Sequence, residues 1–154
     1  MTAETTGTTT QPTVTRPTRF GASFKHPLRW LPAAALVIAG AAHVPVIPAH
    51  LHEAPYIGIL FIVLAVGSLV LAGVITFYDV AAAYVLTAVM MALALVAYII
   101  SRTFGLPLIG DDVGNWLEPL GVVAVIAELV ACVAAIALSR KFARQHGPHT
   151  SPAT

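Results

Sequence analysis

Four long apolar runs occupy most of the sequence between residues 30 and 138, and they restrict this chain to very few folds. The second run, residues 56–77, contains no charged residue, and the third, residues 80–100, follows it almost at once. A helix needs roughly 20 apolar residues to cross a bilayer. Only 10% of the 154 residues are charged, whereas soluble domains average about 25%. We therefore predict an all-α, four-helix transmembrane bundle formed by residues 29–139.

The first and fourth runs need more interpretation. The first starts at Trp30 and crosses the membrane only if the helix continues through Pro45 and Pro48. Pro45 has no N–H group, so a kink is expected about one turn from His43. An alternative is a cleaved signal peptide with small residues at 39–42. The fourth run begins near residue 119, where proline suits the first helical turn.

The flanking segments predict the orientation. Residues 1–28 are rich in Thr and Pro, residues 140–154 are basic, and both segments are expected to be disordered tails. Of the eight Lys and Arg residues, six lie in these flanks and Arg29 lies directly beside the first, which leaves Arg102 alone at the opposite end. Basic residues favour the cytoplasmic side of a membrane. We therefore predict a multi-pass plasma-membrane protein with both termini in the cytoplasm.

A His-rich segment follows the first run and would face outward. On a helix, His43 and His50 lie on one face and Glu53 follows His50 by three residues; in an extended chain His50 and His52 point the same way. Imidazole and carboxylate groups suit zinc or copper, so His43, His50, His52 and Glu53 are candidate metal ligands. The alternative is that they are polar residues at the headgroup level, because their spacing matches no strong metal motif. Haem is disfavoured because the later runs contain no histidine.

Glu128 lies about halfway along the fourth run, near the expected middle of the bilayer. A charged group there is costly and usually faces protein or water. Its helical neighbours are small residues, which favour close packing by another helix. One hypothesis is a proton or cation relay with His43. The other is a neutral carboxyl that bonds to a neighbouring helix, which is favoured because His43 is expected several ångströms nearer the outer face.

The remaining charged residues lie on the outer side. Arg102 ends the third run and has three acidic candidates as partners, Asp111, Asp112 and Glu118, so a structural role is expected. The chain has no hydrolase triad, glycine-rich phosphate loop or pair of cysteines, which argues against an enzyme. It also has no basic stripe with interleaved aromatic residues, so nucleic acid is not expected as a partner.

Three segments carry a resemblance to a known group of proteins. They are HVPVIPAHLHEAPYIG (residues 43–58), SRTFGLP (101–107) and WLEPLG (116–121), with Ala127 and Glu128 following the last. Together they resemble small four-span membrane proteins of actinobacteria. The resemblance covers most of residues 30–138 and implies the four-span topology, with no mechanism attached.

These observations leave three functional hypotheses. The first is a binding or accessory membrane protein with an outward-facing His/Glu site that holds zinc or copper. The second is a small proton- or cation-coupled transporter subunit that uses Glu128. The third is a structural subunit of a larger membrane complex. The lipid bilayer is the expected partner in each case, together with a second copy of the chain or a larger assembly.

Overall fold

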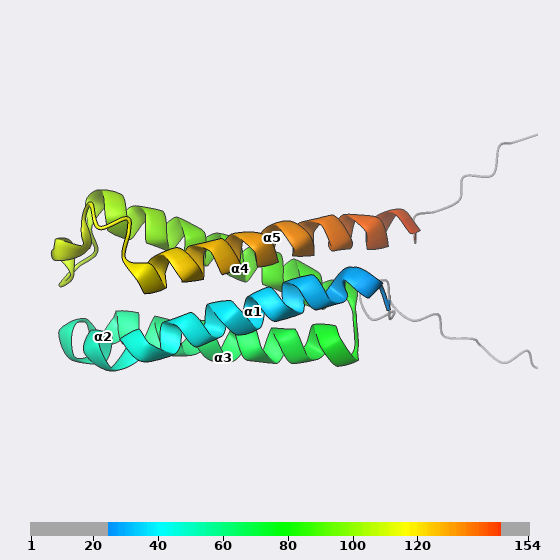
Figure 1. Cartoon of the computed structure of the whole chain (residues 1–154), viewed down its shortest axis with the longest axis horizontal. Coiled ribbons are helices and arrows are strands. Elements are labelled where there is room, and N and C mark those ends of the chain that lie inside the picture. Colours follow the sequence, from blue (N-terminus) through cyan, green and yellow to red (C-terminus); the bar gives the residue numbers. More distant parts are fainter. Residues whose placement is uncertain (1–24, 146–154) are drawn as a thin grey trace, which may run out of the picture.

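The computed structural model describes residues 25–145, which form a bundle of four long helical segments aligned along one axis (Figure 1). No β-strand occurs among these residues, which confirms the predicted all-α fold. In chain order the elements are η1 (Pro27–Arg29), α1 (Trp30–His43), η2 (Val44–Val46), α2 (Ile47–Glu53), α3 (Pro55–Phe77), α4 (Ala81–Phe104), η3 (Gly110–Asp112) and α5 (Pro119–Gln145).

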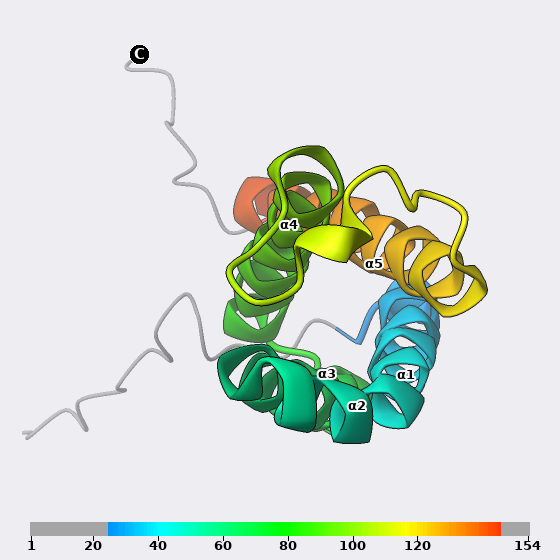
Figure 2. The same cartoon turned by 90° about the vertical axis from the view of Figure 1, so that its left-hand side faces the viewer.

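The four segments form a ring when viewed along the bundle (Figure 2). Helix α1 packs against α3 and α5, while α4 packs against α5 and, less extensively, against α3. Large apolar side chains on the outer faces remain exposed, among them Leu60, Val66 and Ile126. Four segments are long and apolar enough to cross a bilayer: Pro27–Glu53, Pro55–Phe77, Ala81–Phe104 and Pro119–Gln145. The chain is therefore a multipass membrane protein whose outer surface suits lipid.

The first segment continues through its prolines. Helix α1 ends at His43, and the 3-10 turn η2 surrounds Pro45 before α2 begins at Ile47. The N–H group of Val44 donates to the carbonyl of Ala41, the acceptor that Pro45 would otherwise leave without a partner. The predicted distortion next to His43 is thus present, and the segment still reaches 27 residues.

Two helices extend beyond their predicted ends. Helix α4 continues to Phe104, so residues 101–104 belong to the helix and not to the loop. Helix α5 continues to Gln145, which corrects the expectation that residues 140–145 belong to a disordered tail. Phe142 is buried there, which explains why the helix continues past the apolar run. Residues 1–24 and 146–154, the rest of the predicted tails, lie outside the described residues.

The two ends of the bundle are formed by different elements. We call the end with η1, the Tyr78–Val80 connection and the last turn of α5 the terminal end. The end with α2 and residues 105–118 is the loop end.

Between the two ends, the interior of the bundle is lined mainly by alanine. A β-carbon built on Gly40 would lie 3.2 Å from the carbonyl oxygen of Ala65. Small side chains therefore let α1 and α3 approach closely.

Candidate functional site

Glu128 lies inside the bundle, as its small helical neighbours predicted. Ala124, Ala131 and Ala135 are buried on the same face of α5, and Glu128 itself is only 2% exposed. This face packs against α1 on one side and α4 on the other. A carboxyl group is therefore held in a largely apolar interior, where it needs a polar partner.

His43, at the end of α1, is the group that meets it. The His43 Nε2 atom lies 3.6 Å from Oε1 of Glu128, and both side chains are buried. His43 was expected several ångströms nearer the outer face, which argued against a relay with Glu128. The two side chains nevertheless reach each other, because both extend well beyond their backbones. A second ionisable group does meet Glu128 in the interior.

The other imidazole nitrogen determines the tautomer of His43. Nδ1 lies 2.7 Å from the carbonyl oxygen of Ala39. Because a carbonyl oxygen can only accept, Nδ1 must carry a hydrogen and donate it. In the neutral imidazole Nε2 is then an acceptor, and it faces Glu128. A protonated carboxyl group at Glu128 would therefore complement the free lone pair of Nε2.

Phe61 of α3 separates this pair from the second histidine. Its ring centroid lies 5.0 Å from that of His43 and 4.9 Å from that of His50. Seven helical residues span about 10 Å, so a ring in contact with both must lie between them. His50 also uses Nδ1 to donate to a carbonyl, that of Val46, at 2.8 Å. Both imidazoles thus donate from Nδ1 to the carbonyl four residues earlier, and both contact the Phe61 ring.

The predicted metal ligands are not gathered into one cluster. His43 is buried, His50 is partly exposed, and His52 and Glu53 are exposed on α2. Nowhere in residues 25–145 do three or more His, Cys, Asp or Glu side chains come together as a metal site would require. Zinc or copper binding at these residues remains a prediction.

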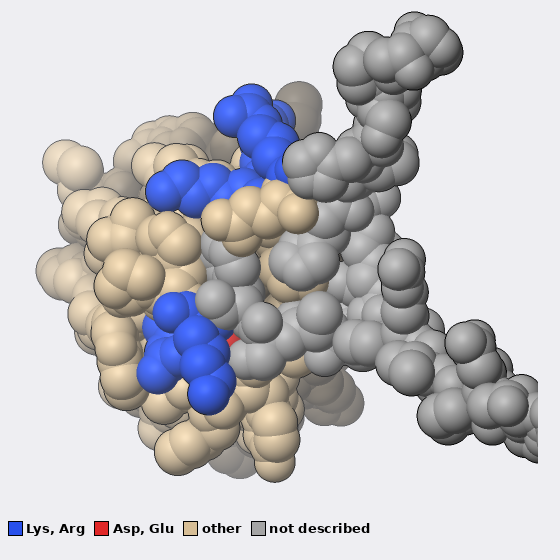
Figure 3. All heavy atoms as spheres, turned by 90° about the vertical axis from the view of Figure 1, so that its right-hand side faces the viewer, with Lys and Arg blue, Asp and Glu red and all other residues tan. Residues whose placement is uncertain are grey.

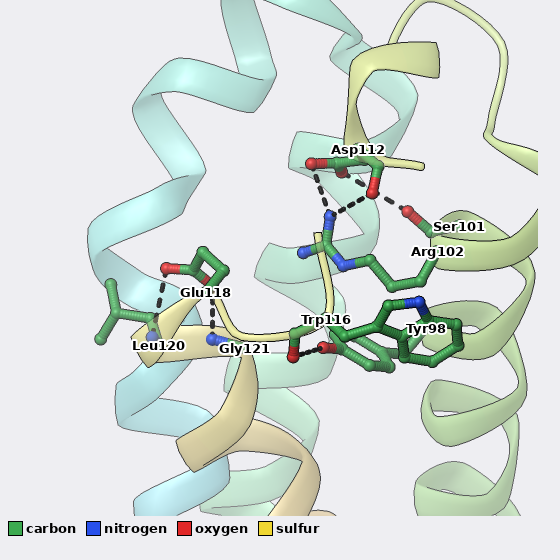
Figure 4. A network of polar contacts seen from close by, with 8 residues as sticks. All are labelled: Tyr98, Ser101, Arg102, Asp112, Trp116, Glu118, Leu120 and Gly121. Atoms are coloured by element: carbon green, nitrogen blue, oxygen red, sulfur yellow. Dashed lines mark hydrogen bonds and ion pairs between the residues drawn. The ribbon is translucent and has the colours of Figure 1, made fainter. Parts of the chain in front are cut away.

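At the loop end, Arg102 pairs with Asp112, one of its three predicted partners (Figure 4). The distance from Nη1 to Oδ1 is 2.6 Å, and the hydroxyl of Ser101 donates to the other carboxylate oxygen at 3.4 Å. The Arg102 guanidinium also lies over the Tyr98 ring, and the Tyr98 hydroxyl donates to the carbonyl of Trp116 at 3.0 Å. These contacts fix the loop on α4, as the structural hypothesis for Arg102 expected.

The other two acidic residues of the loop end have different positions. Glu118 accepts the N–H groups of Leu120 and Gly121 and so caps the start of α5 (Figure 4). Such a carboxylate satisfies two free donors of the first turn. Asp111 is exposed. Neither residue approaches Glu128, so this network anchors the loop and leaves the interior pair separate.

The terminal end contains a buried acid, Asp79, in the short connection between α3 and α4. Asp79 is 1% exposed; it accepts the N–H of His26 at 2.7 Å and the hydroxyl of Tyr84. Its Oδ2 atom lies 3.6 Å from Nη1 of Arg29, and Lys141 Nζ lies 3.4 Å from Nε2 of His26. Lys and Arg side chains gather on the surface at this end (Figure 3). In the sequence, Arg29 stands directly before the first apolar run, and this position was the one indication that a basic partner for Asp79 lies at the terminal end.

No known protein family matches this chain, and neither do any curated proteins or solved structures. The resemblance to small four-span actinobacterial membrane proteins therefore remains a prediction. The most distinctive feature of the described residues is the contact between His43 and Glu128 inside the bundle.

Proposed function

We propose that the protein is a small proton-translocating membrane protein whose proton-binding site is the His43–Glu128 pair. The observation that supports this is the 3.6 Å approach of two ionisable side chains from different helices inside an apolar bundle. Acidic and imidazole groups within membrane helices commonly belong to proton relays. In the sequence, the absence of a partner for Glu128 favoured a purely structural role, and the contact with His43 removes that reason.

The chemistry follows from the cost of charge in a membrane. A net charge in the bilayer interior is unfavourable, so the pair is expected to rest in an electrically neutral form. Either Glu128 is protonated and His43 neutral, or the proton has moved to Nε2 of His43 and an ion pair forms. Adding one proton leaves a cation and removing one leaves an anion. Both charged forms are transient, as a carrier that releases its proton requires.

We place the protein in the plasma membrane, with both termini in the cytoplasm, because basic residues gather at the terminal end. A bundle of four helices leaves little room for a proton path of its own, so the proposal includes a second copy of the chain, which the reconstituted protein can supply. The actinobacterial resemblance stays within the proposal as a statement about topology.

Metal binding has weaker support. The rings of His43 and His50 both pack on Phe61, and one nitrogen of each already donates to a backbone carbonyl. A zinc or copper ion held by these residues would need further ligands from His52, Glu53 or another chain. Metal analysis of the purified protein addresses this alternative directly.

Proton movement in reconstituted vesicles tests the proposal. The full-length protein is placed in liposomes that contain a pH-sensitive dye, and a potassium diffusion potential drives proton entry. We expect flux in the wild type and a loss of about tenfold or more in Glu128→Gln, because an amide cannot ionise. His43→Gln should lower the flux similarly.

Glu118→Gln is the matched control, because it removes a carboxylate from the same helix at the cap and not in the interior. Its flux should equal that of the wild type. A folded wild-type protein that passes no protons under the applied potential would overturn the proposal. Equal flux in Glu128→Gln and the wild type would do the same.

A further inference from the structure

Two hydroxyl groups in the bundle interior have no hydrogen-bond partner among the described residues. They belong to Ser68 of α3 and Thr87 of α4, and both side chains are fully buried. A hydroxyl without a partner in an apolar interior is costly. Water satisfies such groups where two or more polar partners surround one site. The two hydroxyls therefore point to water inside the bundle.

The register of α4 and α5 gives the depth of Thr87. Cys132 donates its Sγ–H to the carbonyl of Ala88 at 3.5 Å, so these two residues lie side by side. Cys132 follows Glu128 by four residues, about 6 Å along the helix. Helix α5 runs toward the terminal end. Thr87 precedes Ala88 in a helix that starts at the terminal end, so it lies about 7–8 Å from Glu128 on the terminal side.

Ser68 lies at a similar depth on α3, which neighbours α4 in the ring (Figure 2). A β-carbon built on Gly40 would be 3.3 Å from Cβ of Ser68, so Ser68 faces this point of α1. Gly40 precedes His43 by three residues, about 4.5 Å, in a helix that runs away from the terminal end. Both unpaired hydroxyls therefore lie on the terminal side of the His43–Glu128 pair, within about one and a half turns of it.

The next polar group in the same direction connects to the terminal end. Tyr84 lies three residues before Thr87 on the same inward face of α4, and it is fully buried. Its hydroxyl donates to Asp79, and Asp79 reaches Arg29 and the N–H group of His26 at the end of the bundle. At the loop-end side, by contrast, the ring of Phe61 covers His43.

We propose that a chain of water molecules held by Ser68 and Thr87 connects Asp79 and Tyr84 with Glu128 and delivers protons to the interior pair from the terminal end. This inference rests on the proposed function, since it supplies the path to that site. The ligand is water or hydronium, and the two hydroxyls position it. Each proton transfer passes one proton along a hydrogen bond, and no group is consumed.

Exchange of the Glu128 carboxyl proton with solvent tests the path without any transport assay. The full-length protein in lipid nanodiscs is mixed with heavy water, and the infrared carbonyl band of protonated Glu128 is followed as hydrogen is replaced by deuterium. Loss of this band in Glu128→Gln assigns it. We expect fast exchange in the wild type, and exchange slowed about tenfold or more in Thr87→Val combined with Ser68→Ala, because no hydroxyl then holds the water.

Two further variants serve as controls. Thr87→Ser retains the hydroxyl and should keep fast exchange. Met91→Leu changes an apolar side chain on the same face of α4, one turn beyond Thr87, and should also keep it. The two single variants, Thr87→Val and Ser68→Ala, are measured as well, so that poor folding of the combined variant still leaves two independent readings.

The outcomes separate this inference from the proposed function. Slow exchange in the hydroxyl variants supports the water path even if the wild type moves no protons, in which case the proposed function fails alone. Unchanged exchange in all hydroxyl variants overturns the path and leaves the interior pair as the proton-binding site. If Glu128 shows no protonated band at any pH, both are overturned.

Discussion

At the scale of single residues, the polar groups of the interior depend on contacts between helices. Glu128 of α5 gains from His43 of α1 a polar contact that the surrounding alanines cannot give. Asp79 likewise gains Arg29 and Tyr84 at the terminal end. The hydrogen bonds and ion pairs of each acid therefore depend on how the helices that supply its partners are packed.

The first prediction concerns the coupling between His43 and Glu128. We expect His43→Gln and Glu128→Gln each to lower the free energy of unfolding, and the double variant to cost less than their sum by about 1 kcal/mol, the size of polar contacts in membrane bundles. Unfolding in mixed detergent micelles measures this. Additive effects of the two substitutions would show that the 3.6 Å approach stabilises nothing.

The second prediction concerns Asp79, which has a positive φ of 50°. Asparagine tolerates this conformation and still accepts a hydrogen bond, so Asp79→Asn should cost about 1 kcal/mol. Leucine adds backbone strain and leaves Tyr84 and Arg29 without their partner, so Asp79→Leu should cost about 3 kcal/mol. The same unfolding assay compares the two variants, and equal costs would contradict the role given to Asp79.

The burial of Glu128 could be predicted from the sequence, whereas the identity of its partner could not. Small residues at helical spacing from Glu128 indicated a packed face, because only a neighbouring helix benefits from them. The contact with His43 depends on the register between α1 and α5, and apolar runs hardly encode register because their side chains suit lipid and protein alike. Asp79 was missed as a site because its partner His26 lies 53 residues away in the chain.

At the scale of elements, the close packing of α2 on α3 depends on a glycine. A β-carbon built on Gly58 would lie 2.6 Å from Cγ of Leu51 and 2.8 Å from its backbone nitrogen. Real side chains do not approach so closely, and the backbone of α2 would have to move. Since α2 also holds His50 against Phe61, that movement would disturb the loop-end side of the interior pair.

The third prediction follows from this contact. Gly58→Ala should lower the free energy of unfolding by about 1–3 kcal/mol, as expected for overpacking. Gly73→Ala is the control on the same helix: its β-carbon would meet nothing within 4 Å, and the change should stay within about 0.5 kcal/mol. Thermal unfolding of the two variants compares them, and equal stability would show that α2 can move freely.

At the scale of the whole molecule, the bilayer explains why so much of the fold was predictable. Four runs of sufficient length, separated by short connections, allow little besides an antiparallel bundle. The break at Pro45 was also predictable, because proline cannot donate the helical hydrogen bond. The extension of α5 to Gln145 was not, because it depends on the burial of Phe142 by tertiary contacts.

The fourth prediction concerns orientation. Cysteine at Asp111, an exposed position outside the Arg102–Asp112 pair, should react with a membrane-impermeant thiol reagent on intact cells. Cysteine at Gln145 should react only after the cells are opened, because basic residues place the terminal end in the cytoplasm. Both are made in a Cys132→Ser background. Labelling at Gln145 alone on intact cells would show that the topology is the reverse of the one predicted.

The position of each buried acid in the chain has a consequence for biogenesis. Asp79 finds its partners in His26 and Arg29, which are made before it, and in Tyr84, five residues later. The ribosome therefore completes this anchor before α5 is synthesised. Glu128 lies in the last helix and enters the membrane when His43 is already there. Because His43 is synthesised before Glu128, the carboxyl group of Glu128 can meet its partner as soon as α5 enters the membrane.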